Sequence, residues 1–349
     1  MRILIVKLSA IGDIVHALPA AAAIRSHFPD AEISWVAEQR SAEIVRGCPA
    51  VDHLIEIDTR SLRGGKVIDE VLIEMGRQAR AVRQRKYDVA IDFQGLIKSA
   101  VIAKVSGAKQ RWGFARSAMR EPAGRFLLTD TVEIPERTHV IRKNLRLAAA
   151  AMGFAYDDSK LEFPIATTAE HTAEADAIAL QAGGPFAILN PGGGWVTKLW
   201  HAEKYGRLSD LIYEETGMTS VVVTGPSDAD LAAKVAAGSR TGRLIHAQPG
   251  LKAFYELARR AAVYIGGDTG PTHIAAAAGT PIVGIFGPTE WWRNGSLAPG
   301  DICIERDDIA CRIDCHRRTC DQWICMDIAP EAVFLAVRQR LNIAVQIAV

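Results

Sequence analysis

The sequence predicts an α/β protein made of two halves, each a parallel β-sheet wrapped by helices. Short β-branched runs alternate with helical patterns over residues 1–130, and the same alternation resumes near residue 185. Strands separated by helices pair in parallel, because each helix carries the chain back along the sheet. With 349 residues, the chain is also longer than one compact core usually accommodates.

The first half predicts four strands and four helices. Residues 2–8, "RILIVKL", form an apolar run that ends at the small-residue turn "SAIGD", and an Ala-rich helical pattern follows over residues 14–28. The same reasoning gives strands at residues 31–38, 53–58 and 87–95, and helices at residues 40–46, 67–86 and 96–105. After Asp130 the alternation is lost, and this stretch is the candidate linker, with a helical pattern near residues 141–152.

The second half repeats the pattern and ends in an amphipathic helix that begins with Pro330 and Glu331. Strands are predicted at residues 185–190, 219–225, 243–247, 262–267 and 280–287, and helices at residues 201–216, 231–238, 253–261 and from residue 273. We therefore expect an N-terminal domain over residues 1–165, a C-terminal domain over residues 166–330, and a helix within residues 331–349 that packs across the domain boundary. The cleft between two such domains is the natural binding site.

The composition excludes several classes of protein. Hydrophobic residues make up 49% of the chain, and 41 basic residues nearly balance 40 acidic ones, which argues against a disordered protein and against a dedicated nucleic-acid binder. The longest apolar stretches are interrupted by Pro or Gly and are shorter than the roughly 20 residues that span a bilayer. Because the first residues carry no export signal, we expect a cytoplasmic protein.

Three glycine-rich segments follow strands of the second half: "NPGGGWVTKLW" (190–200), "TGPSD" (224–228) and "GGDTGPTH" (266–273). Glycine lets backbone N–H groups approach an anion closely, and a following helix N-terminus favours negative charge. Lys198 adds a point charge suited to a phosphate. Each segment alone is compatible with an ordinary strand-to-helix turn, but together they predict a phosphate-bearing ligand. None matches the dinucleotide-binding or P-loop patterns.

Three polar residues at helix starts have two interpretations each. Asp13 is either a first-turn acid favoured by the helix dipole or a general base that takes a proton from an acceptor hydroxyl. Asp268 is either an N-cap or, if Thr269 or Gly270 caps the helix, a free carboxylate that accepts hydrogen bonds from sugar hydroxyls. His273 is either a core residue or a donor to a phosphate.

Five separated segments resemble a known family. They occur in the order "RILIVKLSAIGDIVHALPA", "YDVAIDFQGLIKSA", "SAMREPAG", "KLW" and "GGDTGPTHIAAAAGTPIVGIFGPT". Together they resemble the bacterial heptosyltransferases of glycosyltransferase family 9, which build the inner core of lipopolysaccharide, from Arg2 to about Pro288. "DFQGLIKSA" and "REP" resemble most closely the heptosyltransferase I members, which add the first heptose to a Kdo sugar on lipid A.

This resemblance implies a GT-B fold, in which two Rossmann-like, doubly wound domains face a central cleft. The first domain holds the acceptor and the second holds ADP-heptose, and the sugar is transferred with inversion and without a catalytic metal or other cofactor. Asp13 matches the catalytic base of the family. The positions that match its donor contacts are Gly193, Gly194, Lys198, Asp228, Asp268, Thr269, Gly270 and His273.

Two of these donor positions depart from the family pattern. Asp228 stands where the family usually has Glu for the ribose hydroxyls, so a shorter side chain has to make that contact. Gly193 and Gly194 replace a pair of threonines, so hydroxyl contacts to the donor have to become backbone contacts. The rest of the leaving-group chemistry is retained, because Lys198 and helix N–H groups neutralise the charge that builds on departing ADP.

Several basic residues lie in loops or motifs of the first half. A run of charge is usually a solvated face. In the acceptor domain of a heptosyltransferase, however, such side chains are expected to bind Kdo carboxylates and lipid A phosphates, and to hold the protein at the anionic inner face of the inner membrane. The candidate acceptor-binding residues are Arg60, Arg63, Lys66, Lys98 and Arg120.

Four of the six cysteines crowd into "CRIDCHRRTCDQWIC": Cys311, Cys315, Cys320 and Cys325. In a chain without an export signal, thiols or a metal site are favoured over disulfides. The gaps do not form a pair of C-x-x-C motifs, so free thiols are ranked slightly above a structural zinc or iron site. Relatives that glycosylate proteins hold iron in a similar Cys-bearing tail.

The resemblance therefore implies an inverting glycosyltransferase that moves heptose from ADP-heptose to the Kdo–lipid A acceptor. Two alternatives within the family are transfer of another sugar and transfer to a protein. A third, from another class, is a paralogue that binds sugar nucleotides without catalysis. An epimerase that opens the diphosphate–sugar bond fits less well, since it needs no basic acceptor surface.

Overall fold

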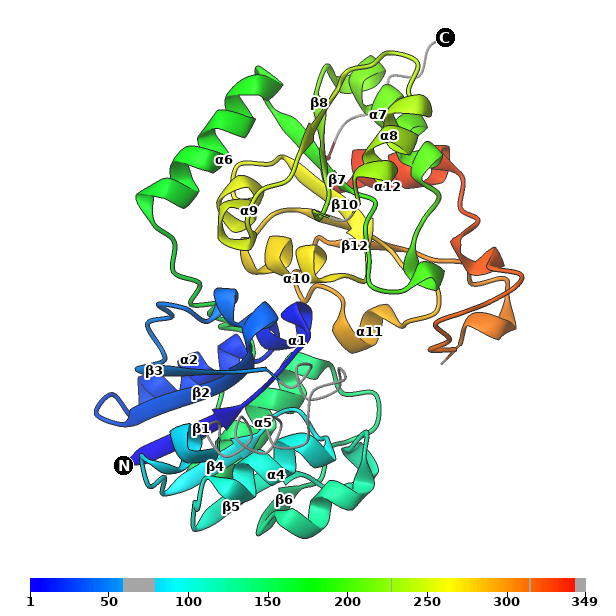
Figure 1. Cartoon of the computed structure of the whole chain (residues 1–349). Helices are drawn as coiled ribbons and strands as arrows, with labels where there is room; N and C mark the ends of the chain where they lie inside the picture. Colours follow the sequence, from blue (N-terminus) through cyan, green and yellow to red (C-terminus); the bar gives the residue numbers. More distant parts are fainter. Residues whose placement is uncertain (59–78, 227, 314, 343–349) are drawn as a thin grey trace, which may run out of the picture. The chain divides into compact units, whose positions relative to one another are not determined.

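The computed structural model describes residues 1–58, 79–226, 228–313 and 315–342 (Figure 1). The chain divides into two compact units, Met1–Ala166 and Thr167–Val349. Each unit contains one six-stranded sheet in which the neighbouring strands are parallel. Helices separate most of these strands along the chain.

The sheet of the first unit has the strand order β3-β2-β1-β4-β5-β6. Its strands are β1 (Arg2–Val6), β2 (Glu32–Glu38), β3 (His53–Ile57), β4 (Val89–Asp92), β5 (Gln110–Phe114) and β6 (Asp130–Val132). Strand β1 lies between β2 and β4, with Ile5 opposite Trp35 and Ile91. This central position explains its uninterrupted apolar sequence, since both faces of β1 are covered.

Helices of the first unit pack on this sheet. They are α1 (Ile11–Val15), α2 (Leu18–His27), α4 (Ile97–Val105) and α5 (Val140–Met152), with short 3₁₀-helices η1 (Gln39–Ile44), η3 (Arg116–Ala118) and η4 (Pro122–Leu127). Leu4 and Val6 point to one face of β1 and form a buried cluster that includes Ala103 of α4. Strands β5 and β6 were not predicted, and the single helix predicted over residues 14–28 is two helices. Most of the helix predicted over residues 67–86 lies outside the described residues.

The sheet of the second unit has the order β12-β11-β10-β7-β8-β9. Its strands are β7 (Phe186–Asn190), β8 (Thr219–Val223), β9 (Leu244–Ala247), β10 (Val263–Gly267), β11 (Ile282–Ile285) and β12 (Ile302–Ile304). Counted from the start of each unit, this order is the same as in the first unit. The predicted strands are present, and β12 is an additional one.

Among the described residues, the second unit holds more helices than the first. They are α6 (Ala169–Ala182), α7 (Ala202–Thr216), α8 (Ala229–Ala237), α9 (Leu251–Ala258), α10 (Gly270–Ala277), α11 (Trp291–Asn294) and α12 (Pro330–Arg340), with 3₁₀-helices η5 (Val196–Lys198), η6 (Ala310–Arg312) and η7 (Ile324–Met326). Val333 and Val337 of α12 are fully buried in the core of this unit, together with Leu208 of α7. Among the described residues, every helix is too short or too polar to cross a bilayer.

Strand order determines where a site forms in such a sheet. In both units the order reverses beside the first strand, between β1 and β4 and between β7 and β10. Ligands of doubly wound sheets bind at the carboxyl ends of the strands on either side of this reversal. The residues that follow β1, β4, β7 and β10 are therefore the candidates for catalysis and ligand binding.

Candidate functional site

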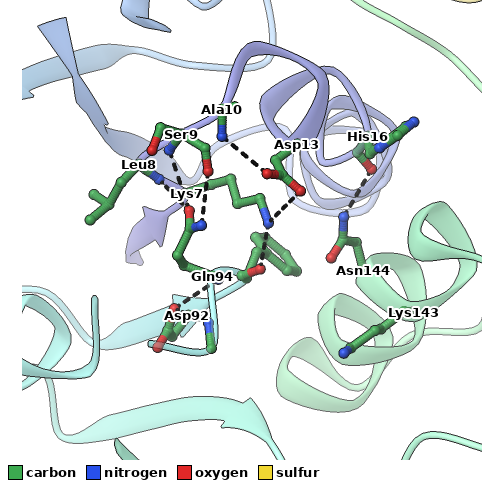
Figure 2. Close-up of polar contacts among 12 residues, drawn as sticks. Lys7, Leu8, Ser9, Ala10, Asp13, His16, Asp92, Gln94, Lys143 and Asn144 are labelled. Atoms are coloured by element: carbon green, nitrogen blue, oxygen red, sulfur yellow. Dashed lines mark hydrogen bonds and ion pairs between the residues drawn. The ribbon is translucent and has the colours of Figure 1, made fainter. Parts of the chain in front are cut away.

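Asp13 lies in the first turn of α1, directly after β1, and its two carboxylate oxygens have different surroundings (Figure 2). Oδ2 accepts a hydrogen bond of 3.0 Å from the backbone N–H of Ala10, which is the helix-capping contact expected of a first-turn acid. Oδ1 lies 3.8 Å from the Nζ atom of Lys7. The Asp13 side chain remains 47% exposed, so one carboxylate can cap the helix and still be reached from solvent.

Lys7 is the buried cation beside this carboxylate. Its side chain is 5% exposed, and Nζ donates a hydrogen bond of 2.9 Å to the carbonyl oxygen of Phe93 at the end of β4. A buried ammonium group requires partners that replace its hydration. Phe93 and Asp13 supply them, so Lys7 links the two strand ends on either side of the reversal.

Gln94 holds the loop between β1 and α1 in place (Figure 2). Its Oε1 accepts hydrogen bonds from the N–H groups of Leu8 at 2.9 Å and Ser9 at 3.3 Å, and its Nε2 donates to the Ser9 carbonyl oxygen at 2.8 Å. The Gln94 side chain therefore makes the backbone hydrogen bonds that a neighbouring strand would otherwise make with this loop. Because this loop leads into Asp13, Gln94 helps to set the position of that carboxylate.

Asp92 holds the backbone of Gln94 in place through a hydrogen bond. It is fully buried, and its Oδ1 accepts a hydrogen bond of 2.8 Å from the backbone N–H of Gln94, while Oδ2 accepts one of 2.9 Å from Ser99 Oγ. Burial raises the pKa of the Asp92 carboxyl to about 6, although the hydrogen bonds from Gln94 and Ser99 oppose that effect. Asp92 is thus a structural group of the first unit that titrates near neutrality.

Three glycine-rich loops of the second unit converge at the ends of β7, β8 and β10. A methyl group added to Gly193 would lie 3.0 Å from Thr269 Cγ2 and 2.9 Å from Leu199 Cδ2, so the loops after β7 and β10 touch there. Methyl groups at Gly192 and Gly225 would lie 3.0 Å and 3.1 Å from Asp228 Oδ2. Glycine at these positions is what permits the close approach.

Asp268 is the centre of a buried polar cluster at the end of β10. Its side chain is 4% exposed, and it forms an ion pair with Lys198 and a hydrogen bond with Asn294 Nδ2. His273 Nε2 lies 3.2 Å from Asp268 Oδ1. Burial alone would raise the pKa of the Asp268 carboxyl, but the His273 contact and the Lys198 charge outweigh burial and hold that pKa far below its usual range. Both oxygens of Asp268 therefore have donors within the second unit, and a sugar hydroxyl would have to displace one of them to bind this carboxylate.

The N-terminus of α10 lies beside this cluster. Thr269 is the N-cap, but its side chain makes no capping hydrogen bond, so the first-turn N–H groups are not satisfied by a cap. Lys198 Nζ also lies 4.4 Å from the centre of the Trp195 ring. A lysine and an uncapped helix N-terminus at one sheet edge form a site with the charge that a diphosphate requires.

The candidate acceptor residues have different outcomes. Lys98 Nζ lies 2.6 Å from Oε1 of the buried Glu38, and Arg40 lies 2.9 Å from the other oxygen of the same carboxylate. Arg120 is exposed, in the loop that follows η3. The remaining candidates, Arg60, Arg63 and Lys66, lie outside the described residues.

Several residues of these clusters, Asp92 among them, were not predicted from the sequence. Lys7 and Gln94 lie within the segments that resemble the family, and a search for polar residues at the ends of β1 and β4 would have found them. Asn294 belongs to the short helix α11 and carries no local signal. Only its contact with Asp268 identifies it.

The four clustered cysteines are free thiols that line one cavity of about 520 Å³. Among the described residues, however, no three or more His, Cys, Asp or Glu side chains are arranged to hold a metal ion. The alternative of a structural zinc or iron site is therefore not supported. Cys320 is exposed, and hydrogen bonds from the N–H groups of Trp323 and Gln322 lower its pKa.

Comparison with known proteins gives one family. The family described as "Glycosyltransferase family 9 (heptosyltransferase)" matches residues 75–323 of this chain. Lipopolysaccharide heptosyltransferase 1 from Pseudomonas aeruginosa is 27% identical over 322 residues, covering 92% of this chain and 87% of that protein. The Escherichia coli K12 protein of the same name is 25% identical over 290 residues, covering 83% of this chain and 89% of that protein.

Solved structures agree with the architecture. The E. coli heptosyltransferase WaaC with ADP matches with a TM-score of 0.79 at 22% identity, covering 97% of this chain and all of that one (100%). WaaC with ADP-2-deoxy-2-fluoro heptose matches with a TM-score of 0.78, covering 97% and 99%. The predicted fold class, a GT-B-type α/β fold with two doubly wound sheets, is thereby confirmed.

Proposed function

Because this chain belongs to glycosyltransferase family 9 (heptosyltransferase), we propose that it transfers heptose from ADP-heptose to the Kdo–lipid A inner core of lipopolysaccharide. The observation that carries the proposal is the Lys198–Asp268 cluster beside the N-terminus of α10, where the strand order reverses. The relatives named above support the choice of sugar and acceptor, because they are lipopolysaccharide heptosyltransferases 1.

On the donor side, the diphosphate of ADP-heptose binds the N–H groups of α10 and the ammonium group of Lys198. Lys198 then exchanges its ion pair with Asp268 for one with phosphate, and the Asp268 carboxylate becomes available to sugar hydroxyls. Asp228, which lies against Gly192 and Gly225, accepts hydrogen bonds from the ribose. Negative charge that builds on departing ADP is neutralised by groups already in place, so the step does not require a divalent ion.

On the acceptor side, Asp13 is the general base. Its Oδ1 takes the proton of the attacking hydroxyl as that oxygen bonds to the anomeric carbon and the bond from that carbon to the ADP oxygen breaks. Attack from the face opposite ADP inverts the anomeric centre. The proposed reaction therefore uses groups of both units, since the base belongs to the first unit and the donor cluster to the second.

Binding of the anionic acceptor falls to Arg60, Arg63, Lys98 and Arg120. Lys98 is held by Glu38 in the absence of acceptor and exchanges that carboxylate for one of Kdo. The acceptor is a membrane lipid, so the protein works in the cytoplasm at the inner face of the inner membrane. In this proposal, the boundary after residue 166 separates the unit that binds the acceptor from the unit that binds the donor.

A mass-spectrometric transfer assay tests this proposal. The intact chain is offered ADP-heptose or other nucleotide sugars together with Kdo–lipid A, and we expect a product heavier by one heptose only with ADP-heptose. Asp13→Asn should abolish product while ADP binding, measured by calorimetry, stays unchanged. Asp30→Asn, at an exposed aspartate of the same unit, is the control and should keep activity.

The other outcomes identify the alternatives. Turnover with another donor, or with a protein acceptor, would replace the substrate assignment and keep the enzyme class. ADP binding without turnover of any donor would indicate a non-catalytic paralogue. Full activity in Asp13→Asn would remove Asp13 from the mechanism.

A further inference from the structure

The cysteine-rich segment, residues 311–325, is held against the loop that carries Lys198. Thr197, the residue before Lys198, is buried, and its Oγ1 donates a hydrogen bond of 2.6 Å to the carbonyl oxygen of Arg317. The carbonyl oxygen of Thr197 accepts a hydrogen bond of 3.0 Å from Trp323 Nε1. The side chain and the carbonyl group of one buried residue therefore bind this segment, which fixes it beside η5.

The cysteine-rich segment is also attached to the loop that follows β11. The N–H of His316 donates a hydrogen bond of 3.0 Å to the carbonyl oxygen of Pro288. A methyl group added to Gly287 would lie 3.1 Å from Cys325 Sγ, so the far end of the segment packs there as well. Strands β7 and β11 are both parallel to β10, which lies between them, so their carboxyl ends lie at one edge of the sheet. The segment therefore lies at the edge where the donor cluster forms.

Two cations lie over the indole ring of Trp195. Lys198 Nζ lies 4.4 Å and Arg318 Cζ lies 5.0 Å from the centre of that ring. This arrangement follows from the hydrogen bond between Thr197 and Arg317, because each cation is the next residue along the chain. The face of an aromatic ring attracts cations. The fold thus brings Arg318 from a distant part of the sequence to the side of Lys198.

The guanidinium group of Arg318 is available to a ligand. Arg318 is exposed, and among the described residues its side chain forms no ion pair. Neighbouring arginines do form ion pairs, since Arg306 pairs with Asp308 and Arg312 pairs with Glu305. The N–H donors of Arg318 can therefore bind an anion at this edge of the sheet.

The charge of the donor cluster leaves a place for a further cation. The pKa of the Asp268 carboxyl is far below its usual range, so this group stays ionised and its charge cancels that of Lys198. A diphosphate that is linked to a sugar carries more than one negative charge, whereas the N-terminus of α10 supplies only about half a positive charge. Arg318 adds a full positive charge beside Lys198.

We propose that Arg318 is a second cation for the diphosphate of the nucleotide-sugar donor. The ring of Trp195 holds the guanidinium group beside Lys198, and the N–H groups of Arg318 donate to phosphate oxygens. The proposal rests on the proposed function and deepens it, because it assigns part of the cysteine-rich segment to the donor site.

Calorimetry of the intact chain with ADP and with adenosine tests the proposal. Arg318→Gln should weaken ADP binding roughly 5- to 30-fold and leave adenosine binding unchanged, because adenosine has no phosphate. Arg317→Gln is the matched control and should bind ADP like the wild type. Its side chain is also exposed, and its hydrogen bond with Thr197 uses the backbone carbonyl group, which the substitution keeps.

The salt dependence of ADP binding is a second measurement. Salt screens the attraction between a cation and a phosphate. Added salt should therefore weaken ADP binding to the wild type and to Arg317→Gln more than it weakens ADP binding to Arg318→Gln.

Three results would overturn the proposal: equal ADP affinity of Arg318→Gln and the wild type, an equal loss of ADP affinity in Arg317→Gln, or an equal loss of adenosine affinity in Arg318→Gln. Failure of the proposed function gives a different result, because the wild type would then transfer no heptose while its ADP affinity still depended on Arg318. A wild-type chain that does not bind ADP would overturn both proposals.

Discussion

Lys7 and Asp13 form an unequal ion pair at the end of β1, in which the cation is buried and the carboxylate is half-exposed. Nζ lies 3.8 Å from Oδ1, and the side chains are 5% and 47% exposed. A buried cation keeps its position because its hydrogen bond to Phe93 fixes it, while the carboxylate stays accessible to a substrate. Lys7 therefore orients the Asp13 carboxylate, the proposed base, and leaves it accessible to solvent.

The first prediction concerns this pair. Lys7→Met should lower kcat for heptose transfer roughly 10- to 100-fold, because the proposed base loses the charge that orients it. ADP affinity should not change, since the donor cluster belongs to the second unit. Steady-state kinetics and calorimetry measure the two quantities. Lys204→Met, at a lysine paired with Asp327, is the control, and an unchanged kcat in Lys7→Met would show that orientation by Lys7 is dispensable.

A second prediction separates stability from binding at Asp268. Lys198→Met should destabilise the second unit by about 3–5 kcal/mol, because it leaves a buried carboxylate without its main counter-charge. Adding Asp268→Asn should restore much of that stability but not ADP affinity, which should stay roughly 10- to 100-fold below wild type. Urea unfolding and calorimetry provide the values. Recovery of ADP affinity in the double variant would contradict the assignment of Lys198 to the diphosphate.

Two adjacent glycines provide a third prediction with its own control. Gly193→Ala should weaken ADP binding and lower the melting temperature, because the added methyl group would lie 2.9 Å from Leu199 Cδ2 and 3.0 Å from Thr269 Cγ2. Gly194→Ala should keep the wild-type melting temperature, since no heavy atom outside the adjacent residues lies within 4 Å of the added carbon. Thermal melts with and without ADP compare the two. Equal effects would mean that the loops after β7 and β10 can separate freely.

The raised pKa of Asp92 gives a prediction for pH. Its folded-state value of about 6 lies above the ordinary 3.8, so the folded protein holds this proton at pH values where the unfolded chain has lost it. The contribution of Asp92 to the free energy of unfolding therefore falls as pH rises from about 4 to about 6 and is constant above that range. Asp92→Asn does not titrate, so its stability relative to wild type should rise by about 2–3 kcal/mol between pH 4 and pH 7.

Urea unfolding of wild type and Asp92→Asn at several pH values tests this directly. The hydrogen bonds that Asp92→Asn loses change its free energy of unfolding by the same amount at every pH. Only the part of the difference between variant and wild type that varies with pH reports the titration of Asp92. A difference that stays flat between pH 4 and pH 7 would show that Asp92 is ionised throughout that range in the folded protein.

Central strands such as β1 and β7 were predictable from the sequence, and so were the edge strands β3 and β9, but the inner strand β5 and the edge strands β6 and β12 were not. Strands such as β1 and β7 are buried on both faces, so their sequences are uninterrupted apolar runs that can be read locally. By contrast, β6 and β12 are three-residue strands that are only partly buried at the edges of their sheets. Short, half-covered strands carry too little apolar pattern to be distinguished from loops.

By itself, the sequence determined the alternation of strands and helices, the glycine-rich loops and the positions of Asp13, Lys198 and Asp268, because these depend on neighbouring residues. Only the tertiary structure decided what those side chains contact. Gln94 reaches Ser9 across 85 residues, and Lys198 reaches Asp268 across 70, because β4 and β10 return beside the first strand of each unit. Burial and hydrogen bonding are set by such distant partners, and so is the charge state of the buried carboxylates.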